Sequence, residues 1–186
     1  MYTTKKIEIN SYIDITKDFI KSSKPNNHKV LNKKYFKDSK GNIYKVDGKN
    51  VVLDYSQKEK ETAIWLKKTF GGKIYMLPRV NNPKGIKTAD YLWNNEKWDL
   101  KETTEKAISK TRAVDNIIKT AKNQTDNIIL DITNTKLSKN NILKQVKKIY
   151  STKGRNWVNK IMIIKNNELI KVYQKNRPPS ERNGND

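Results

Sequence analysis

The chain has 186 residues, with 40 lysines and arginines against 19 aspartates and glutamates, which gives a formal net charge of +21. It contains no cysteine and one histidine, His28, so disulfides, thiolate chemistry, cysteine-type zinc clusters and two-histidine catalysis are excluded. Any catalysis must therefore use carboxylates, lysine, arginine, tyrosine, serine or threonine.

The positive charge favours a polyanionic partner, and nucleic acid is the foremost one. An AT-rich genome would also enrich lysine, asparagine and isoleucine, so the charge does not decide the matter alone. The chain has no long apolar run that could span a bilayer and no apolar signal region at its start. We therefore expect no membrane partner, no signal peptide in this chain and a cytoplasmic site of action.

Composition divides the chain into three parts. Residues 1–40 are polar and lysine-rich, and we expect an N-terminal extension or connector there. Residues 41–175 carry the periodic apolar patterns of one folded domain. Residues 176–186, which contain Pro178-Pro179, are expected to form a disordered tail.

The first element predicted in the domain is a hairpin at residues 42–53, where two β-prone runs flank Asp47-Gly48. Ser56 follows, and Glu59 three residues later completes a capping-box pattern for a helix that ends at Gly71-Gly72. The later elements are a strand at 73–77, a hairpin at 87–102, a helix at 105–122, a strand at 127–132, a helix at 138–150, and strands at 158–164 and 168–173.

This order predicts an α/β (α+β) fold with a mixed central sheet. From Ser56 to Ile132 the elements run helix, strand, strand, strand, helix, strand, and a further helix and two strands extend them. The run at 127–132 is continuously apolar, as in a parallel strand buried on both faces. Residues 168–173, after a turn at Asn166-Asn167, are expected to form a half-buried edge strand.

The hairpin at 87–102, with its turn at Asn94-Asn95, carries the strongest chemical signal. Alternate side chains of a strand share a face, so pairing across this hairpin can bring Asp90, Asp99 and Lys101 together. Carboxylate oxygens are what Mg²⁺ prefers, and an ammonium can stabilise charge on phosphate. A solvated polar face with Lys101 paired to a carboxylate would produce the same alternation, so both interpretations remain open.

Other residues are weaker candidates. If the first helix packs beside the hairpin, Glu61 would come within reach of the two aspartates; otherwise it is a solvated helix residue. Gln124 could orient a substrate or simply cap a helix. Trp157 is the better exposed stacking residue, whereas Trp93 and Trp98 could stack on bases or fill the core. The predicted phosphate-contacting residues are Arg112, Lys119, Lys122, Lys153 and Arg155.

The element order, with Ala89-Asp90 on one strand and Asp99-Leu100-Lys101 on the next, resembles the PD-(D/E)XK nuclease superfamily. Ala89 stands where the family has proline. The wider sequence is also similar to the C-terminal nuclease domains of contact-dependent-inhibition toxins of the CdiA type and to related domains in Gram-positive phage proteins. The similarity covers roughly residues 50–175 and is carried by residues 71–79, 85–92, 98–101, 124–131 and 155–158.

The resemblance implies an αβββαβ restriction-endonuclease-like core and a nuclease domain at 41–175. Members of the toxin group largely cleave tRNA, which implies an endoribonuclease, with RNA a better substrate than DNA, and an acidic immunity protein as a partner. In such an enzyme Asp90 and Asp99 would hold Mg²⁺ or Mn²⁺ with Glu61 as a further ligand. Lys101 would orient water or neutralise charge, and Gln124 would orient the substrate.

Three alternatives remain open from the sequence. The domain could be a DNA endonuclease of a phage or mobile element. It could be a metal-independent toxin RNase that cleaves through the ribose 2′-hydroxyl with Lys101, Thr103, Arg112 or Gln124. It could also be a non-catalytic basic module that binds nucleic acid. The last is disfavoured because two carboxylates facing phosphate would repel it unless a cation intervened.

Overall fold

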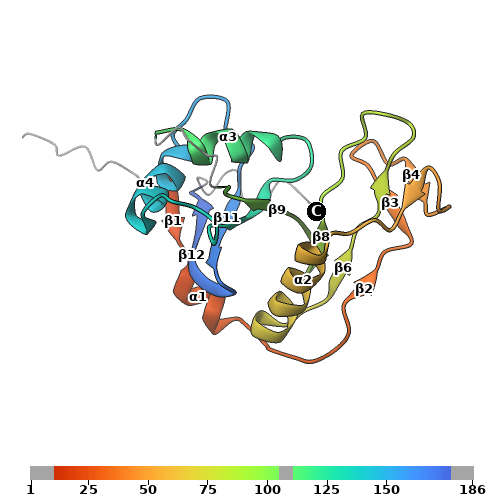
Figure 1. The fold of residues 1–186 in the computed structure, drawn as a ribbon, viewed down its shortest axis with the longest axis horizontal. Coiled ribbons are helices and arrows are strands. Elements are labelled where there is room, and N and C mark those ends of the chain that lie inside the picture. Colours follow the sequence, from red (N-terminus) through yellow and green to blue (C-terminus); the bar gives the residue numbers. More distant parts are fainter. Residues whose placement is uncertain (1–10, 105–110, 177–186) are drawn as a thin grey trace, which may run out of the picture.

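The computed structural model describes residues 11–104 and 111–176 (Figure 1). The helices are α1 (Thr16–Lys21), α2 (Gln57–Phe70), α3 (Ala113–Thr120) and α4 (Lys139–Ile149). The strands are β1 (Tyr12–Asp14), β2 (Leu31–Asn32), β3 (Tyr35–Lys37), β4 (Ile43–Lys45), β5 (Val51–Val52), β6 (Ile74–Met76), β7 (Arg79–Val80), β8 (Tyr91–Trp93), β9 (Glu96–Glu102), β10 (Asn127–Asp131), β11 (Lys160–Lys165) and β12 (Glu168–Lys175).

A mixed sheet of eight strands, in the order β1-β12-β11-β10-β9-β8-β6-β2, forms the centre of the fold. Its middle part runs β6, β8 and β9 antiparallel, and β10 is parallel to both β9 and β11. The predicted helix-strand-strand-strand-helix-strand order is present as α2, β6, β8, β9, α3 and β10, with the short β7 added after β6. The expected α/β (α+β) class with a mixed sheet, extended by α4, β11 and β12, is confirmed.

Helices cover both faces of the sheet, with α3 and α4 on one side and α2 on the other (Figure 1). The strand β10 explains this layering because all five of its residues are buried. Its Ile128 and Leu130 join the core under α3 and α4, whereas Ile129 joins the core under α2. The prediction of a parallel strand buried on both faces is therefore confirmed. In the described part of the chain, no helix combines the length and apolarity needed to cross a membrane.

The start of α2 is fixed by polar contacts. Ser56 Oγ accepts a hydrogen bond from Glu59 N at 3.1 Å, and Glu59 Oε2 accepts one from Ser56 N at 2.8 Å, which confirms the capping box. Lys58 Nζ lies 2.5 Å from Oδ2 of Asp131, a residue at the end of β10 that is almost fully buried. The ion pair thus places the first turn of α2 beside the C-terminal end of β10.

The β8–β9 hairpin has the predicted turn. Asn94 and Asn95 have φ of 51° and 66°, the left-handed pair that a two-residue turn between twisted strands requires. Tyr91 is paired with Trp98, and Asp90 N donates to Trp98 O at 3.1 Å. This register places Asp90 across from Asp99.

The predicted hairpin at 42–53 is wrong in its pairing. The turn at Asp47 forms, because Asp47 Oδ1 accepts hydrogen bonds from the backbone N of Lys49, Asn50 and Val51. The flanking strands then separate: β4 pairs with β3, and β5 pairs with β7. β4 thus forms a local hairpin with the strand before it, and only β5 finds a distant partner in place of the pairing that the Asp-Gly signal suggested.

The N-terminal part of the chain also differs from expectation. β1 pairs with β12, so β12 is not the edge strand that the sequence predicted, and β2 pairs with β6 at the opposite edge. The boundary expected at residue 40 falls in the turn between β3 and β4. Residues 1–10, the predicted tail from 177 onward and the first part of the predicted helix at 105–122 lie outside the described residues.

The contact between Gly71 and Lys24 supplies a test of the fold. Gly71, at the end of α2, has φ of 75°, and a Cβ built there would lie 1.6 Å from the Lys24 carbonyl oxygen. Gly48 has a similar φ of 76°, with nothing within 4 Å of its Cβ position. Alanine at Gly48 incurs the cost of a positive φ, roughly 1–2 kcal/mol, whereas Gly71, with ψ of −154°, adopts a conformation essentially restricted to glycine. We expect Gly71→Ala to lower the free energy of unfolding clearly more than Gly48→Ala in urea titrations, and equal losses would contradict the described contact.

Candidate functional site

A polar pocket of about 310 Å³ opens beside the β8–β9 hairpin, where the start of α2 meets the loop before β8. Acidic and basic side chains contribute to it in equal number. The acids are Glu59, Asp90 and Asp99, and the bases are Arg79, Lys87 and Lys101. The remaining lining residues are Val80, Ile86, Thr88, Leu100 and Gln124. The pocket therefore gathers the three hairpin residues that the sequence singled out.

The geometry of the hairpin holds Asp90, Asp99 and Lys101 as a unit. Lys101 Nζ lies 2.5 Å from Oδ2 of Asp99, two residues earlier on the same face of β9. Asp90 reaches across from the preceding strand, and its Oδ2 accepts a hydrogen bond from Leu100 N at 2.7 Å. Asp99 is fully buried, and its Oδ1 has no hydrogen-bond donor among the described residues.

Burial changes the protonation of this pair. The pKa of Asp90 is raised to about 8, first by its removal from water and then by the negative charge of Asp99, while the bond from Leu100 N acts in the opposite direction. Burial also raises the pKa of Asp99, although the Lys101 ammonium opposes that effect. Two carboxylates that resist simultaneous ionisation need a compensating cation when both are charged.

The helix α2 does contribute a carboxylate to the pocket, but it is Glu59 and not Glu61. Glu61 is exposed, lies outside the pocket lining and accepts a hydrogen bond from Gln57 Nε2 at 2.9 Å. The reason is helical spacing: residues two apart on a helix point to different sides. The expectation that Glu61 reaches the aspartates is therefore corrected.

Arg79 and Glu59 are the site residues that sequence reasoning missed. Arg79 Nη2 lies 2.5 Å from Glu59 Oε1 and 4.0 Å from Asp90 Oδ1, and Arg79 Nε donates to the Asp54 carbonyl at 2.6 Å. Glu59 was recognised in the sequence only as a helix cap, and Arg79 was assigned to a loop. Their convergence depends on β7, a two-residue strand that leaves no periodic signal.

Gln124 lines the pocket, as the sequence suggested. Its Nε2 donates to the Thr88 carbonyl at 3.2 Å, and its buried Oε1 has no partner among the described residues. The bond to a carbonyl fixes which end of the amide is the donor, so the free atom is the acceptor. This acceptor would suit a hydroxyl or amino group of a ligand.

The pocket fits a cation held by two carboxylates. Asp90 and Asp99 offer oxygen ligands from adjacent strands, and a buried oxygen of Asp99 lacks a donor. In residues 11–104 and 111–176, no group of three or more acidic or histidine side chains is arranged around a common metal position. The third acid, Glu59, is instead engaged by Arg79 and by the cap of α2.

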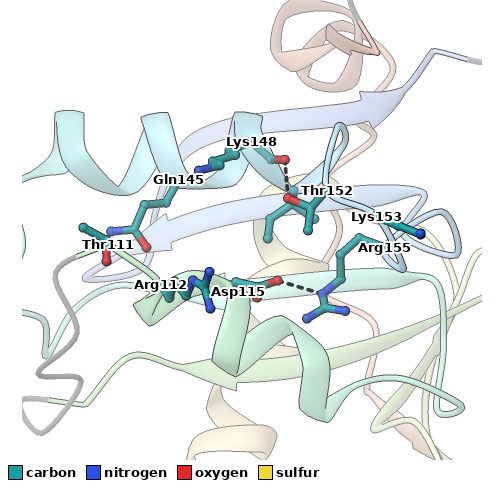
Figure 2. Close-up of a pocket in the computed structure, with 9 residues that line it drawn as sticks. Thr111, Arg112, Asp115, Gln145, Lys148, Thr152, Lys153 and Arg155 are labelled. Atoms are coloured by element: carbon teal, nitrogen blue, oxygen red, sulfur yellow. Dashed lines mark hydrogen bonds and ion pairs between the residues drawn. The ribbon is translucent and has the colours of Figure 1, made fainter.

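A second, basic pocket of about 270 Å³ lies between α3, α4 and the loop after α4 (Figure 2). It contains the predicted phosphate-contacting residues Arg112, Lys153 and Arg155, together with Lys148. Arg155 Nε donates to Asp115 Oδ1 at 2.7 Å, as Figure 2 shows, so its guanidinium is anchored. The lining has four cationic side chains and one acidic side chain.

The other predicted contact residues are placed differently. Lys119 and Lys122, near the end of α3, are exposed and line neither of these two pockets. Trp157 is half-buried against the core under α3 and α4 and is more exposed than Trp93 and Trp98, as expected. Trp93 and Trp98 are 3% and 1% exposed, so both fill the core under α2, which decides between the two interpretations left open.

Part of the chain that includes this site is similar to a known protein family. Residues 87–170 match the family model of the contact-dependent growth inhibition CdiA C-terminal domain. The match covers less than half of the chain. It includes β8, β9, α3, β10, α4 and β11, and hence Asp90, Asp99, Lys101 and Gln124, but not Glu59 or Arg79.

Two further comparisons complete the picture. The fold is similar to a chain of the CdiA-CT/CdiI toxin and immunity complex from Burkholderia pseudomallei, with a TM-score of 0.45 and 17% sequence identity. That alignment covers 67% of this chain and 91% of the other. A comparison with curated protein sequences found no match.

The raised pKa of Asp90 predicts a pH-dependent stability. Between the unfolded value near 4 and the folded value of about 8, the folded protein holds a proton that the unfolded chain releases. Stability in metal-free buffer therefore falls as pH rises through this window. Asp90→Asn, which mimics the protonated acid, should raise Tm by several degrees at pH 8 and by clearly less at pH 5.

Thermal unfolding in EDTA at the two pH values measures this difference. Asp18→Asn, which changes an exposed aspartate of α1, is the matched control and should shift Tm little at either pH. An Asp90→Asn gain that is the same at pH 5 and pH 8 would contradict the described burial of the pair.

Proposed function

We propose that this chain is a toxin-type nuclease that hydrolyses phosphodiester bonds, with the Asp90–Asp99–Lys101 pocket as its active site. One observation carries the proposal: the buried carboxylate of Asp99 on β9 and the partly buried one of Asp90, just before β8, share a pocket with an ammonium 2.5 Å from Asp99. A purely structural pair would be costly, because burial raises the pKa of both carboxyl groups and so opposes their ionisation in the folded protein. Such cost is typical of functional sites.

The residues of the pocket have separate roles in this proposal. Lys101 would place its Nζ beside the reacting phosphate and stabilise the negative charge that develops on its oxygens. Arg79, held by Glu59, would keep a second positive charge at the mouth of the pocket. Gln124 would orient the nucleotide through its free Oε1. In the reaction the oxygen of water attacks phosphorus, the bond from phosphorus to the leaving oxygen breaks, and that oxygen takes up a proton.

Asp90 and Asp99 would bind Mg²⁺ or Mn²⁺. When bound, such an ion lowers the pKa of a coordinated water and polarises the phosphate. The carboxylates' part is to supply two hard oxygen ligands from rigid strands, since β9 is held by hydrogen bonds on both sides. Lys101, which is paired to Asp99, would offset the negative charge of the carboxylates, so that the pocket can admit a phosphate.

The proposed substrate is RNA, and tRNA in particular. The support is the likeness of residues 87–170 to the CdiA C-terminal domain together with the net charge of +21. The basic pocket between α3 and α4 would contact phosphates away from the reacting bond, which positions a substrate without reading its sequence. The proposal also places the action of the toxin in the cytoplasm of a target cell. It further includes neutralisation by an acidic immunity protein, because a highly positive surface favours an acidic partner.

A metal-independent RNase is the second candidate, and one observation favours it. Among the described residues no three acidic side chains are arranged to hold one metal ion, and Lys101 already forms an ion pair with Asp99. In that chemistry the ribose 2′-hydroxyl loses its proton and its oxygen attacks phosphorus, the bond from phosphorus to the 5′ oxygen breaks, and that leaving oxygen takes up a proton, which leaves a 2′,3′-cyclic phosphate. Lys101 and Gln124 lie in the pocket and could serve it. Thr103 is 1% exposed with its Oγ1 donating to the Asp131 carbonyl, and Arg112 lines the other pocket, so neither lines this one.

The proposed active site predicts which substitutions abolish cleavage. Asp99→Asn and Lys101→Ala should each lower cleavage of bulk tRNA by at least about a hundredfold, because the first removes a charged ligand of the proposed cation and the second removes the ammonium beside the reacting phosphate. Lys139→Ala, an exposed lysine at the start of α4, is the control and should cleave within about twofold of the parent. Gel analysis of tRNA, with circular dichroism to confirm folding, provides the measurement.

Full cleavage by folded Asp99→Asn and Lys101→Ala proteins would remove this pocket as the active site. EDTA separates the two chemistries in the same assay. Cleavage that stops in EDTA supports the carboxylate-bound ion, whereas cleavage that continues and leaves a cyclic phosphate supports the second candidate.

A further inference from the structure

A third pocket, of about 420 Å³, adjoins the proposed active site beneath the β3–β4 hairpin. It shares Ile86, Lys87 and Gln124 with the active-site pocket, so this groove borders that pocket directly. Its other wall comes from the turn and strands of the hairpin. The lining there is formed by Phe36, Asp38, Ser39, Lys40, Asn42 and Tyr44, with Gly85, Lys97 and Asn123 completing it.

The chemistry of this groove suits a polyanion with polar edges. Three lysines, Lys40, Lys87 and Lys97, face one aspartate, Asp38. The aspartate is already engaged: its Oδ2 accepts from Asn42 Nδ2 at 2.9 Å and from the Tyr44 hydroxyl at 3.2 Å. Its Oδ1 accepts from two backbone N–H groups of the turn. Asp38 therefore shapes the turn, and the lysines give the groove its positive charge.

The hairpin is held in a fixed position relative to the active site. Lys97, on β9 two residues before Asp99, donates from Nζ to the Lys37 carbonyl at 3.2 Å. The same ammonium lies 4.7 Å from the ring centroid of Phe36, a buried residue of β3. The hairpin and the catalytic strand are thus joined directly, and the groove between them does not depend on a loose arm.

Gln124 connects the two pockets chemically. Its unpartnered Oε1 belongs to a residue that lines both, so a ligand that spans them could donate a hydrogen bond to it. Ribose hydroxyls and the exocyclic amino groups of bases are such donors. Unpaired RNA can place a splayed-out nucleotide in such a pocket, whereas the bases of an A-form duplex stay stacked and paired and present mainly phosphates and 2′-hydroxyls to a protein.

We propose that this groove holds the single-stranded segment of the nucleic acid next to the bond that is cut, and that the β3–β4 hairpin is a substrate-binding arm. Lys40 and Lys87 contact backbone phosphates of that segment, and Gln124 Oε1 accepts from the nucleotide nearest the carboxylates. The inference rests on the proposed function for its direction, because the groove leads into the Asp90–Asp99 pocket. It adds a substrate class, an unpaired strand, and a part of the chain outside the matched residues 87–170.

The test compares two charge reversals in a background that does not cut. Asp99→Asn protein carrying Lys40→Glu is compared with the same protein carrying Lys17→Glu. Lys17 is an exposed lysine of α1, which lies at the opposite end of the molecule from the β3–β4 hairpin (Figure 1). The probe is a fluorescein-labelled oligouridylate of about twelve nucleotides, within the usual range of single-strand sites. Fluorescence anisotropy gives Kd at fixed salt.

Lys40→Glu should weaken binding at least about tenfold, and Lys17→Glu less than about twofold. Equal weakening by the two substitutions, or no binding of the probe by the Asp99→Asn parent, would overturn the proposal. A duplex of the same length should compete poorly, and duplex binding as tight as that of the single strand would also overturn it.

The failure of the two proposals can be distinguished. If Lys40→Glu weakens binding but the wild-type chain never cleaves RNA, the groove remains a single-strand site and the proposed nuclease activity is contradicted. If the wild-type chain cleaves RNA but Lys40→Glu leaves the Kd unchanged, the nuclease activity stands and the proposed role of the groove is contradicted.

Discussion

The register of the β8–β9 hairpin is the constraint on which the site depends. The left-handed Asn94-Asn95 turn fixes which residues of the two strands face each other, and a slip of one residue would move every side chain to the opposite face. With this register Asp90 and Asp99 meet, and Lys101 lies 2.5 Å from Asp99. β10 pairs with the other side of β9, so the hairpin has little freedom to adjust. Burial of these carboxylates opposes folding, and the surrounding sheet compensates for it.

Local signals predicted the elements that local interactions determine. The capping box at Ser56, the Asn94-Asn95 turn and the apolar run of β10 each leave a short and specific pattern, and each was found. Pairing over long distances leaves no such pattern. The turn at Asp47 formed as expected, yet β4 paired with the preceding β3 and β5 with the distant β7, and this arrangement buries Phe36, Val51 and Val80 in one cluster.

The candidate site shows the same division. Asp90, Asp99, Lys101 and Gln124 could be named from the sequence, because the hairpin and the αβββαβ order bring them together. The carboxylate of α2 could not be named, because the rotation of the helix about its own axis decides whether Glu59 or Glu61 faces the sheet. Arg79 could not either, since its position depends on a strand of two residues. The groove beneath the β3–β4 hairpin depends on a tertiary contact, that of Lys97 with the Lys37 carbonyl, and no spacing in the sequence indicates it.

The central claim is that the two hairpin carboxylates can hold one cation beside an ammonium. Anomalous diffraction from crystals soaked in Mn²⁺ tests this claim most directly. The account predicts a manganese peak in the pocket, with oxygens of both Asp90 and Asp99 at about 2.0–2.2 Å, and no peak there in Asp99→Asn crystals. Saturating Mn²⁺ that leaves the pocket empty, or that binds only at other surfaces, would contradict it.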